Sequence, residues 1–275
     1  MKKLLIPMTL MLLILAACGG DDQDAGDTEE PQNLEGQTLE VASLIPPMLD
    51  ILEIAQDILA EEDGIELEIV ELSDNIQPND ALATEEVDAN FFQHVPYMEE
   101  YNRNNDSDLT AIQPIYYANY GVYAQDYDTM DEIPDGADIA IANDISNLDR
   151  SLRLLDDHGI ITLAETDNPH YTLSDIEENP HDYNFQEVDL LMLARSYDDV
   201  DAVLMTPAYA EPLDLTPKSD ALLTEGEEND FAITLIARED NADSEVIQRL
   251  AEAMSSDEVL EFLEENYEET SIPAF

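Results

Sequence analysis

ADIAIAN at residues 137–143, followed by SNLDRSLRLLDDHG at residues 146–159, decides the fold class. The first stretch is a short apolar run of the length expected for a buried strand. In the second, Leu148, Leu152 and Leu155 recur at helical spacing and form one apolar stripe. A buried strand that leads directly into an amphipathic helix is the repeating unit of sheets built from parallel strands.

The same order recurs on both sides of this unit. LEVASLI at residues 39–45 precedes an amphipathic helix that ends at Gly64, and IELEIVEL at residues 65–72 alternates as a half-buried strand. PNDALATEEVDANFF at residues 78–92 predicts a short helix and another strand, and AVLMTPAYA at residues 202–210 repeats the pattern. The sequence therefore predicts an α/β fold with parallel sheets covered by helices.

The N-terminus has the layout of a secretory signal. Two lysines precede a predominantly apolar run at residues 4–17, whose 14 residues would cover only about 21 Å of a hydrocarbon core about 30 Å thick. LAAC at residues 15–18 resembles the bacterial lipobox, and Cys18 is the only cysteine of the chain. We predict a signal peptide at residues 1–17, a lipid on Cys18 and a disordered acidic tether at residues 18–37. The alternative is an ordinary signal followed by a buried free cysteine.

Charge limits the partners of the protein. The chain has 66 acidic and 9 basic residues, and removal of the signal leaves 7 basic residues and a net charge near −59. Such a field excludes nucleic acid and anionic lipid as binding partners. It is tolerable only where ions screen it, since the Debye length falls from about 8 Å at physiological salt to about 3 Å at 1 M. We expect a protein that works in strong brine.

The remaining body is expected to fold on its core alone. With Cys18 lipidated, no cysteine remains for a disulfide, a thiolate nucleophile or a metal ligand. The mature chain is longer than a usual single domain, which favours two lobes.

Signatures of catalysis are missing from the sequence. It has no GxSxG, HExxH, Walker or GxGxxG motif. Its histidines, His94, His158, His170 and His181, show no close pairing of the kind that binds metals. We therefore expect a binding protein with no catalytic residues, no metal and no cofactor.

Two of the few basic residues lie on the central predicted helix. Arg150 and Arg153 are three residues apart, close to asparagine side chains at the start of the helix. A helix N-terminus, asparagine amides and an arginine together make a receptor for a carboxylate. We assign Arg150 to a ligand and Arg153 to a surface ion pair with an acid such as Asp149 or Asp157.

Several long and unusual stretches of the sequence are SDNIQPNDAL at 73–82, DANFFQHVPY at 88–97, ANDISNLDRSL at 142–152, ENP at 178–180 and ARSYDDVDAVLMTPAYA at 194–210. In these stretches the sequence resembles the NlpA-type (MetQ-type) family of methionine-binding lipoproteins. The resemblance extends from Leu39 to Phe275. It implies a type II periplasmic-binding-protein fold, with two α/β lobes, a ligand cleft between them and two crossover strands. We expect lobe 1 at residues 38–118 plus 231–275 and lobe 2 at residues 119–230.

The resemblance also implies a ligand-binding set. Transferred to this sequence, it consists of Phe91, Phe92, His94, Tyr97, Tyr117, Asn143, Asn147, Arg150 and Thr206. Two positions depart from the family pattern, because Thr206 and Ile233 stand where methionine binders of the family carry asparagines that hold the ligand's zwitterion. The loop at residues 46–48 also lacks the family's glycine-containing form.

The resemblance implies a lipid-anchored, monomeric substrate-binding protein on the outer face of the cell membrane. Such a protein delivers its ligand to an ABC permease and the ATPase of that permease. Methionine is the leading ligand, and another amino acid or a short peptide stays open. The alternative function is a binding or adhesion lipoprotein that has no importer.

Overall fold

The computed structural model describes residues 34–226 and 229–275. The predicted signal peptide at residues 1–17, Cys18 and most of the predicted tether at residues 18–37 lie outside the described residues. The last tether residues contact the folded body, since Leu34 packs against the core and Gly36 N donates to Gly64 O. Within the described part of the chain, no helix combines the length and apolar character that a membrane span requires.

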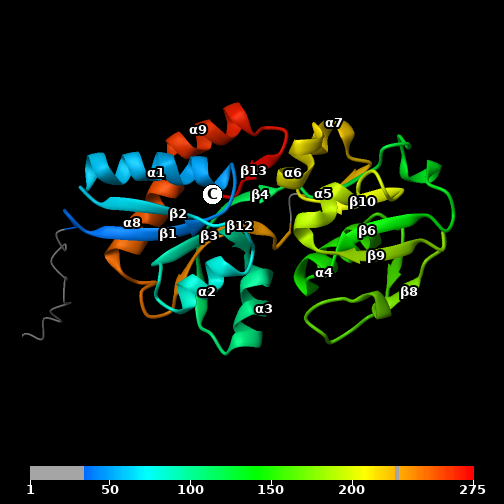
Figure 1. The fold of residues 1–275 in the computed structure, drawn as a ribbon, viewed down its shortest axis with the longest axis horizontal. Helices are drawn as coiled ribbons and strands as arrows, with labels where there is room; N and C mark the ends of the chain where they lie inside the picture. Colours follow the sequence, from blue (N-terminus) through cyan, green and yellow to red (C-terminus); the bar gives the residue numbers. More distant parts are fainter. Residues whose placement is uncertain (1–33, 227–228) are drawn as a thin grey trace, which may run out of the picture. The chain divides into compact units, whose positions relative to one another are not determined.

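The first sheet combines strands from the two ends of the folded chain (Figure 1). Its order is β13-β4-β12-β3-β1-β2. The strands are β1 (Thr38–Ser43), β2 (Glu66–Glu71), β3 (Ala89–His94), β4 (Leu109–Ala118), β12 (Ala232–Arg238) and β13 (Ser271–Pro273).

Helices cover both faces of this sheet. Val41 contributes to a core with three helices, and Ala42, the next residue of β1, contributes to a separate core with two others. Successive residues of a strand point to opposite faces, so the two helix groups lie on opposite sides. The first group is α1 (Met48–Glu62), α8 (Glu245–Met254) and α9 (Asp257–Asn266). The second is α2 (Gln77–Ala83) and α3 (Val95–Asn105).

The second sheet contains the stretch that opened the sequence analysis. Its order is β11-β5-β10-β6-β9. Ile139 and Ile141 of β6 pack under the apolar stripe of α4, whereas Ala140 and Ala142 face α5 and α6. The strands are β5 (Gly121–Tyr123), β6 (Asp138–Ala142), β9 (Asn184–Val188), β10 (Ala202–Met205) and β11 (Leu223–Thr224). The helices are α4 (Ile145–Asp157), α5 (Leu193–Ser196), α6 (Pro207–Ala210) and α7 (Pro217–Asp220).

Shorter elements complete the described chain. A two-stranded sheet is formed by β7 (Thr162–Leu163) and β8 (Ile176–Glu178). Single 3-10 turns are η1 (Met130–Glu132), η2 (Leu173–Asp175), η3 (Leu190–Met192) and η4 (Glu211–Leu213).

Both larger sheets are mixed, so the expectation of parallel sheets holds for only part of each sheet. β1 pairs in parallel with β2 and β3, and β6 pairs in parallel with β9 and β10. The chain passes between the sheets twice, from β4 to β5 and from β11 to β12. β4, β12 and β5 make antiparallel pairs in the sheets. The strand-to-helix units thus give the parallel parts, and the crossing segments add antiparallel strands.

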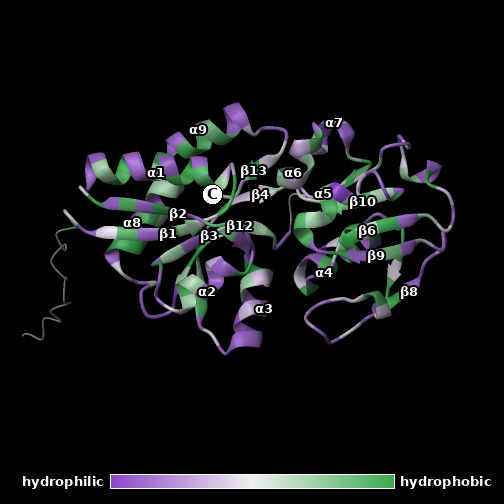
Figure 2. Cartoon of the chain, viewed as in Figure 1, coloured by the Kyte–Doolittle hydropathy of each residue, from purple (hydrophilic) through white to green (hydrophobic). Residues whose placement is uncertain are grey.

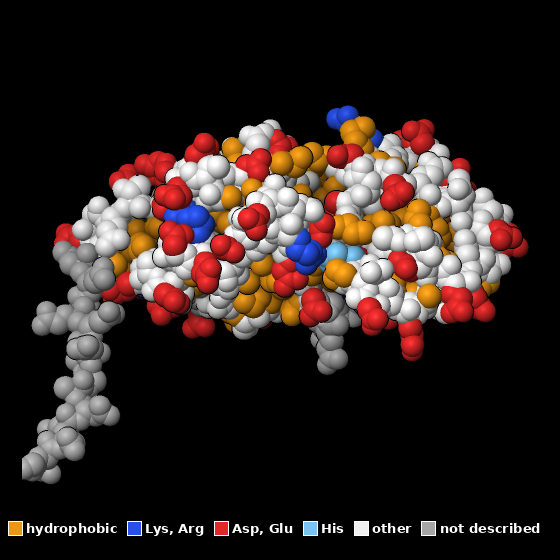
Figure 3. Space-filling model, turned by 90° about the horizontal axis from the view of Figure 1, so that it is seen from below, with side chains coloured by type: hydrophobic (Ala, Val, Ile, Leu, Met, Phe, Trp, Pro, Cys, Tyr) orange, Lys and Arg blue, Asp and Glu red, His pale blue; other side chains and the backbone are white. Residues whose placement is uncertain are grey.

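The distribution of residue types fits this architecture. Hydrophobic residues are concentrated in the strands and on the inner faces of the helices (Figure 2). Acidic side chains are scattered over the face seen in Figure 3, where basic side chains are few.

Candidate ligand-binding cleft

A cavity of about 60 Å³ lies between the two sheets. The first sheet and its connections supply Leu44, Ile45, Met48, Asn75, Phe92, Gln93, His94, Tyr97, Tyr116, Ala118 and Ile233. The second supplies Asn147, Arg150, Leu190, Thr206, Ala208 and Tyr209. Since an apolar cavity of about 150 Å³ holds benzene, an amino acid the size of methionine requires these walls to move apart.

Six of the nine predicted ligand-binding residues line this cavity. They are Phe92, His94, Tyr97, Asn147, Arg150 and Thr206. They come from β3, α3, α4 and the start of α6, elements that are distant in sequence and that the fold brings together.

The other three predicted residues lie elsewhere. Phe91 is fully buried in the core, where its ring meets Tyr116 edge-on at 6.2 Å between centroids. Tyr117 is half-buried on β4, and its neighbour Tyr116 lines the cavity instead. Asn143 has an exposed side chain, and its backbone N–H donates to Val188 O. Adjacent residues of a strand point to opposite faces of the sheet. Phe92 and Tyr116 therefore line the cavity, whereas their neighbours Phe91 and Tyr117 do not.

Arg150 is buried at one side of the cavity, with only 1% of its surface exposed. Its Nε and Nη2 donate to the carboxylate of Glu225 at 2.7 and 2.6 Å, and Nη2 also donates to Ala118 O at 2.8 Å. The guanidinium carbon lies 4.6 and 4.8 Å from the ring centroids of Tyr120 and Phe231. Its third nitrogen, Nη1, is buried and has no hydrogen-bond partner. An unpaired charged donor is costly unless something accepts its hydrogens.

Glu225 was not identified from the sequence. It lies 75 residues after Arg150, in the segment that passes from β11 to β12, and its side chain is 8% exposed. Among 66 acidic residues, no local pattern distinguishes it. Nε and Nη2 of the arginine therefore have partners in the fold, and Nη1 has none.

The N-terminus of α4 is not a free carboxylate site, which corrects that part of the expectation. Asp144 caps the helix, and its carboxylate accepts hydrogen bonds from Asn147 N, Asn147 Nδ2 and Ser146 Oγ at 2.9 to 3.1 Å. The helix therefore supplies its own anion at this end. Of the polar groups predicted to form the receptor, Nη1 of Arg150 is the one that is buried without a hydrogen-bond partner.

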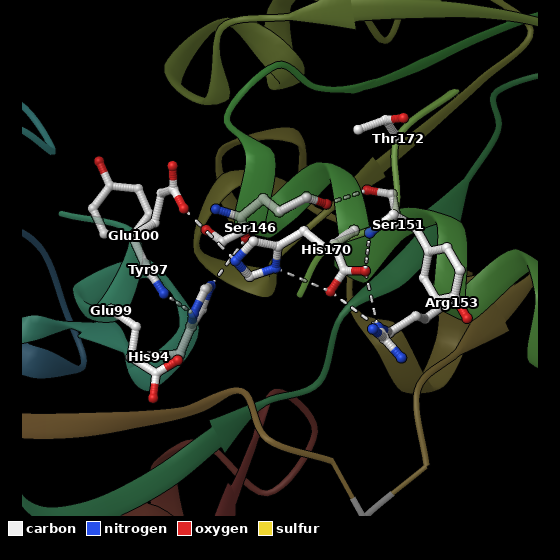
Figure 4. Close-up of polar contacts among 12 residues, drawn as sticks. His94, Tyr97, Glu99, Glu100, Ser146, Ser151, Arg153, His170 and Thr172 are labelled. Atoms are coloured by element: carbon white, nitrogen blue, oxygen red, sulfur yellow. Dashed lines mark hydrogen bonds and ion pairs between the residues drawn. The ribbon is translucent and has the colours of Figure 1, made fainter. Parts of the chain in front are cut away.

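His94 connects the two halves of the cleft. It is the N-cap of α3, where its Nδ1 accepts a hydrogen bond from Tyr97 N at 3.2 Å (Figure 4). The proton is therefore on Nε2, which faces Asn147 Oδ1 at 3.2 Å. Burial, helped by the positive charge of Arg150, lowers the pKa of His94 to about 3. The ring is therefore neutral near pH 7, and both of its nitrogens have partners.

Aromatic and aliphatic groups form the rest of the wall. The rings of Phe92 and Tyr97 meet edge-on at 6.0 Å. The Tyr97 hydroxyl donates to Asn75 O at 3.1 Å, and burial raises its pKa well above its ordinary value. Ile233 is 5% exposed and lines the cavity beside Tyr116, its partner across the strands. This wall suits an apolar side chain.

Several lining residues were missed by the sequence reasoning. They are Leu44, Ile45, Met48, Asn75, Gln93, Tyr116, Ala118, Leu190, Ala208 and Tyr209. Leu44 and Ile45 precede the loop at residues 46–48, and Met48 is its last residue; the departure of this loop from the family pattern was the available signal. Among the described residues, no cluster of histidine and acidic side chains has the arrangement of a metal site.

The similarity to known proteins covers the whole described body. A model of the NlpA lipoprotein family matches residues 39–275. The methionine-binding lipoprotein MetQ of Bacillus subtilis (strain 168) is 33% identical over 280 residues, which cover 99% of each chain. A nutrient-binding protein from Burkholderia cenocepacia, solved bound to methionine, is 30% identical with a TM-score of 0.83 over 86% of this chain and 100% of that chain.

A periplasmic substrate-binding protein of an ABC transporter from Coxiella burnetii is 32% identical, with a TM-score of 0.82 over 86% of this chain and 100% of that chain. These structures confirm the predicted periplasmic-binding-protein fold. The family match, the relatives and the shared fold agree that the chain belongs to the NlpA lipoprotein family.

Proposed function

We propose that the protein is the extracytoplasmic substrate-binding lipoprotein of an ABC importer. Its ligand is an amino acid with an unbranched apolar side chain, and methionine is the leading candidate. The ligand binds between the two sheets, with its carboxylate bound to Arg150 and its side chain packed against Phe92, Tyr97 and Ile233.

One observation carries the proposal. Nη1 of Arg150 is buried without a partner beside a cavity whose other walls are largely apolar. A carboxylate accepts such a donor strongly, and charge-assisted hydrogen bonds are about twice as strong as neutral ones. Since Glu225 already neutralises the arginine, a zwitterionic ligand leaves the site close to electrically neutral.

The apolar end favours a flexible side chain. Met48, Phe92, Tyr97 and Ile233 surround it, and a thioether contacts aromatic edges favourably. Thr206 supplies one hydroxyl where the family has an amide, so the ligand's ammonium group has fewer side-chain acceptors here than in methionine binders of the family.

The test is a calorimetric titration in molar salt. The panel contains L-methionine, D-methionine, norleucine, leucine and a methionine-containing dipeptide. We expect L-methionine to bind more tightly than norleucine or leucine, because its thioether contacts the aromatic edges of Phe92 and Tyr97 favourably. Preference for the dipeptide would assign the site to a short peptide. No binding by any compound would contradict the transport function and favour the adhesion alternative.

Membrane attachment and delivery complete the proposal. Cys18 carries two or three acyl chains, which hold a protein stably where one chain is marginal. The body stays monomeric and presents the closed cleft to the permease. Mass spectrometry of the mature protein should find the lipid on an N-terminal Cys18; an unmodified cysteine would contradict the anchor.

A further inference from the structure

The two lobes that close on the ligand carry like charges. Residues 34–118 with 231–275 contain 32 acidic and 3 basic residues, and residues 119–230 contain 28 acidic and 4 basic residues. Bringing two such bodies together is opposed by electrostatic repulsion. Contacts across the cleft must therefore offset that repulsion, and the few basic residues are the groups that can do so.

One of these contacts lies at the edge of the cleft, between α3 and the segment that follows β7. Arg103 of α3 donates from Nη2 to Nε2 of His170 at 2.6 Å. The same nitrogen donates to Glu100 Oε2, one helical turn away, at 2.7 Å. His170 is 8% exposed and belongs to the second lobe. The arginine thus binds one group from each lobe.

The other side of the His170 ring faces α4 (Figure 4). Nε2 accepts from Arg103, and Nδ1 lies 3.5 Å from Asp149 Oδ2, a close contact that lacks hydrogen-bond geometry. Asp149 is 5% exposed and accepts from Tyr171 N at 2.8 Å and from Arg153 Nε at 2.9 Å. Its position is therefore fixed by the second lobe alone.

Without Arg103, the carboxylates of Glu100 and Asp149 would face the same histidine from the two lobes with no cation of α3 between them. Glu99 Oε2 is 3.8 Å from Arg103 Nη1, and Glu100 Oε2 is 3.8 Å from His170 Nε2. With Arg103 present, the electrostatic interaction between α3 and the second lobe is attractive at this edge of the cleft.

We propose that Glu100, Arg103, Asp149 and His170 form an interlobe clasp that sets how long the cleft stays closed. None of the four lines the ligand cavity, so they act on the ligand only through closure. The cavity is too small for a methionine-sized ligand to enter unless its walls separate, and separation of the walls breaks the contact between Arg103 and His170. The effect on ligand release rests on the proposed function, whereas the effect on closure does not.

The first measurement is hydrogen–deuterium exchange of the full-length protein without ligand. In Arg103→Gln, amides of residues 95–105 and 164–172 should exchange faster than in the wild type, and more so in 1 M than in 4 M salt. Arg195→Gln is the matched control, because it also removes one cation, from an exposed side chain of α5 whose nitrogen lies 3.6 Å from Met192 Sδ. Arg103→Lys should recover most of the protection.

The second measurement is the release of L-methionine. Arg103→Gln should raise the dissociation rate constant about 3- to 10-fold, with little change in the association rate constant and the same melting temperature as Arg195→Gln. In a double-mutant cycle with His170→Asn, the second substitution should add little to the first. Equal exchange in Arg103→Gln and Arg195→Gln, or additive effects in the cycle, would overturn the clasp. A wild type that fails to bind methionine but shows the exchange difference would contradict the ligand assignment and leave the clasp standing.

Discussion

At the scale of single residues, Arg150 has two roles that must be separated. It pairs with Glu225, which stabilises the fold, and in the proposed function its unpartnered Nη1 receives the ligand carboxylate. Truncation of the arginine alone would leave Glu225 buried without a partner, and breaking a buried pair in this way is strongly destabilising. A binding test therefore needs a background in which the glutamate is already neutral.

The first prediction compares three variants. Glu225→Gln should bind the ligand at least as tightly as the wild type, because the arginine keeps its full positive charge. Arg150→Ala in that background should lose about 2–5 kcal/mol, or roughly 30- to several-thousand-fold in affinity, since the ligand carboxylate is left buried and unpaired. Arg195→Ala, which removes an exposed cation, should change affinity little. Titration calorimetry measures all three; unchanged binding in the double variant would remove the carboxylate assignment.

His94 gives the second prediction, through the pH dependence of stability. Its pKa is lowered from 6.5 to about 3 by burial and by Arg150. Between these values the unfolded chain binds a proton at this residue and the folded chain does not, so the contribution of His94 to stability falls as the pH falls. From pH 7 to pH 5 the loss is about 2 kcal/mol.

His94→Asn should abolish this part of the pH dependence, and asparagine can still cap α3. The relevant quantity is the difference in unfolding free energy between variant and wild type, because the many carboxylates titrate equally in both. His181→Asn, at an exposed position, is the control. A constant difference between pH 7 and pH 5 would show that His94 is not held neutral by burial.

Some of the site was predictable from the sequence and some was not. Phe92, His94 and Arg150 lie in long family-like stretches and do line the cavity. The offset of one residue between Tyr117 and Tyr116 reflects strand facing, which β4 does not reveal because it is apolar on both sides. The pairing of Glu225 with Arg150 could not be predicted from the sequence, because it depends on tertiary contacts between residues 75 positions apart.

At the scale of elements, the local sequence pattern of α4 predicted the helix correctly but not the state of its N-terminus. Its apolar stripe and its place after a buried strand predicted the helix, which spans Ile145–Asp157. The Asp144 side chain, however, occupies the helix N-terminus that was expected to help hold a ligand. The parallel strands followed from the same local patterns, whereas the antiparallel strands depend on how the chain crosses between sheets.

The third prediction concerns this cap. Asp144→Ala removes the acceptor for Asn147 N and should cost about 0.5–2 kcal/mol of stability. Asp144→Asn removes the same charge but keeps a capping oxygen, so it should lose much less. Urea unfolding in constant molar salt compares the two; equal losses would mean that charge, and not the cap, is what Asp144 contributes.

At the scale of the whole molecule, the dominant feature is self-repulsion. The mature chain has a net charge near −59, and many of its acids are exposed, as on α9. Salt shortens the distance over which these charges repel one another, so stability should rise with ionic strength.

The fourth prediction is that the melting temperature rises steadily between 0.5 M and 3 M KCl. A variant with Glu261→Gln, Glu264→Gln and Glu265→Gln, three exposed acids of α9, should melt higher at 0.5 M and gain less from added salt. Identical salt dependence in the wild type and this variant would show that surface repulsion does not govern stability.

The central claim is that the cleft holds an amino acid by its carboxylate. The most direct measurement is a crystal structure of the protein grown in molar salt with the tightest ligand of the panel. We predict electron density between the two sheets, with a carboxylate oxygen about 2.7–2.9 Å from Nη1 of Arg150 and the side chain against Phe92 and Ile233. Density for the ligand outside this cleft, or an ammonium group in place of the carboxylate at Arg150, would contradict the account.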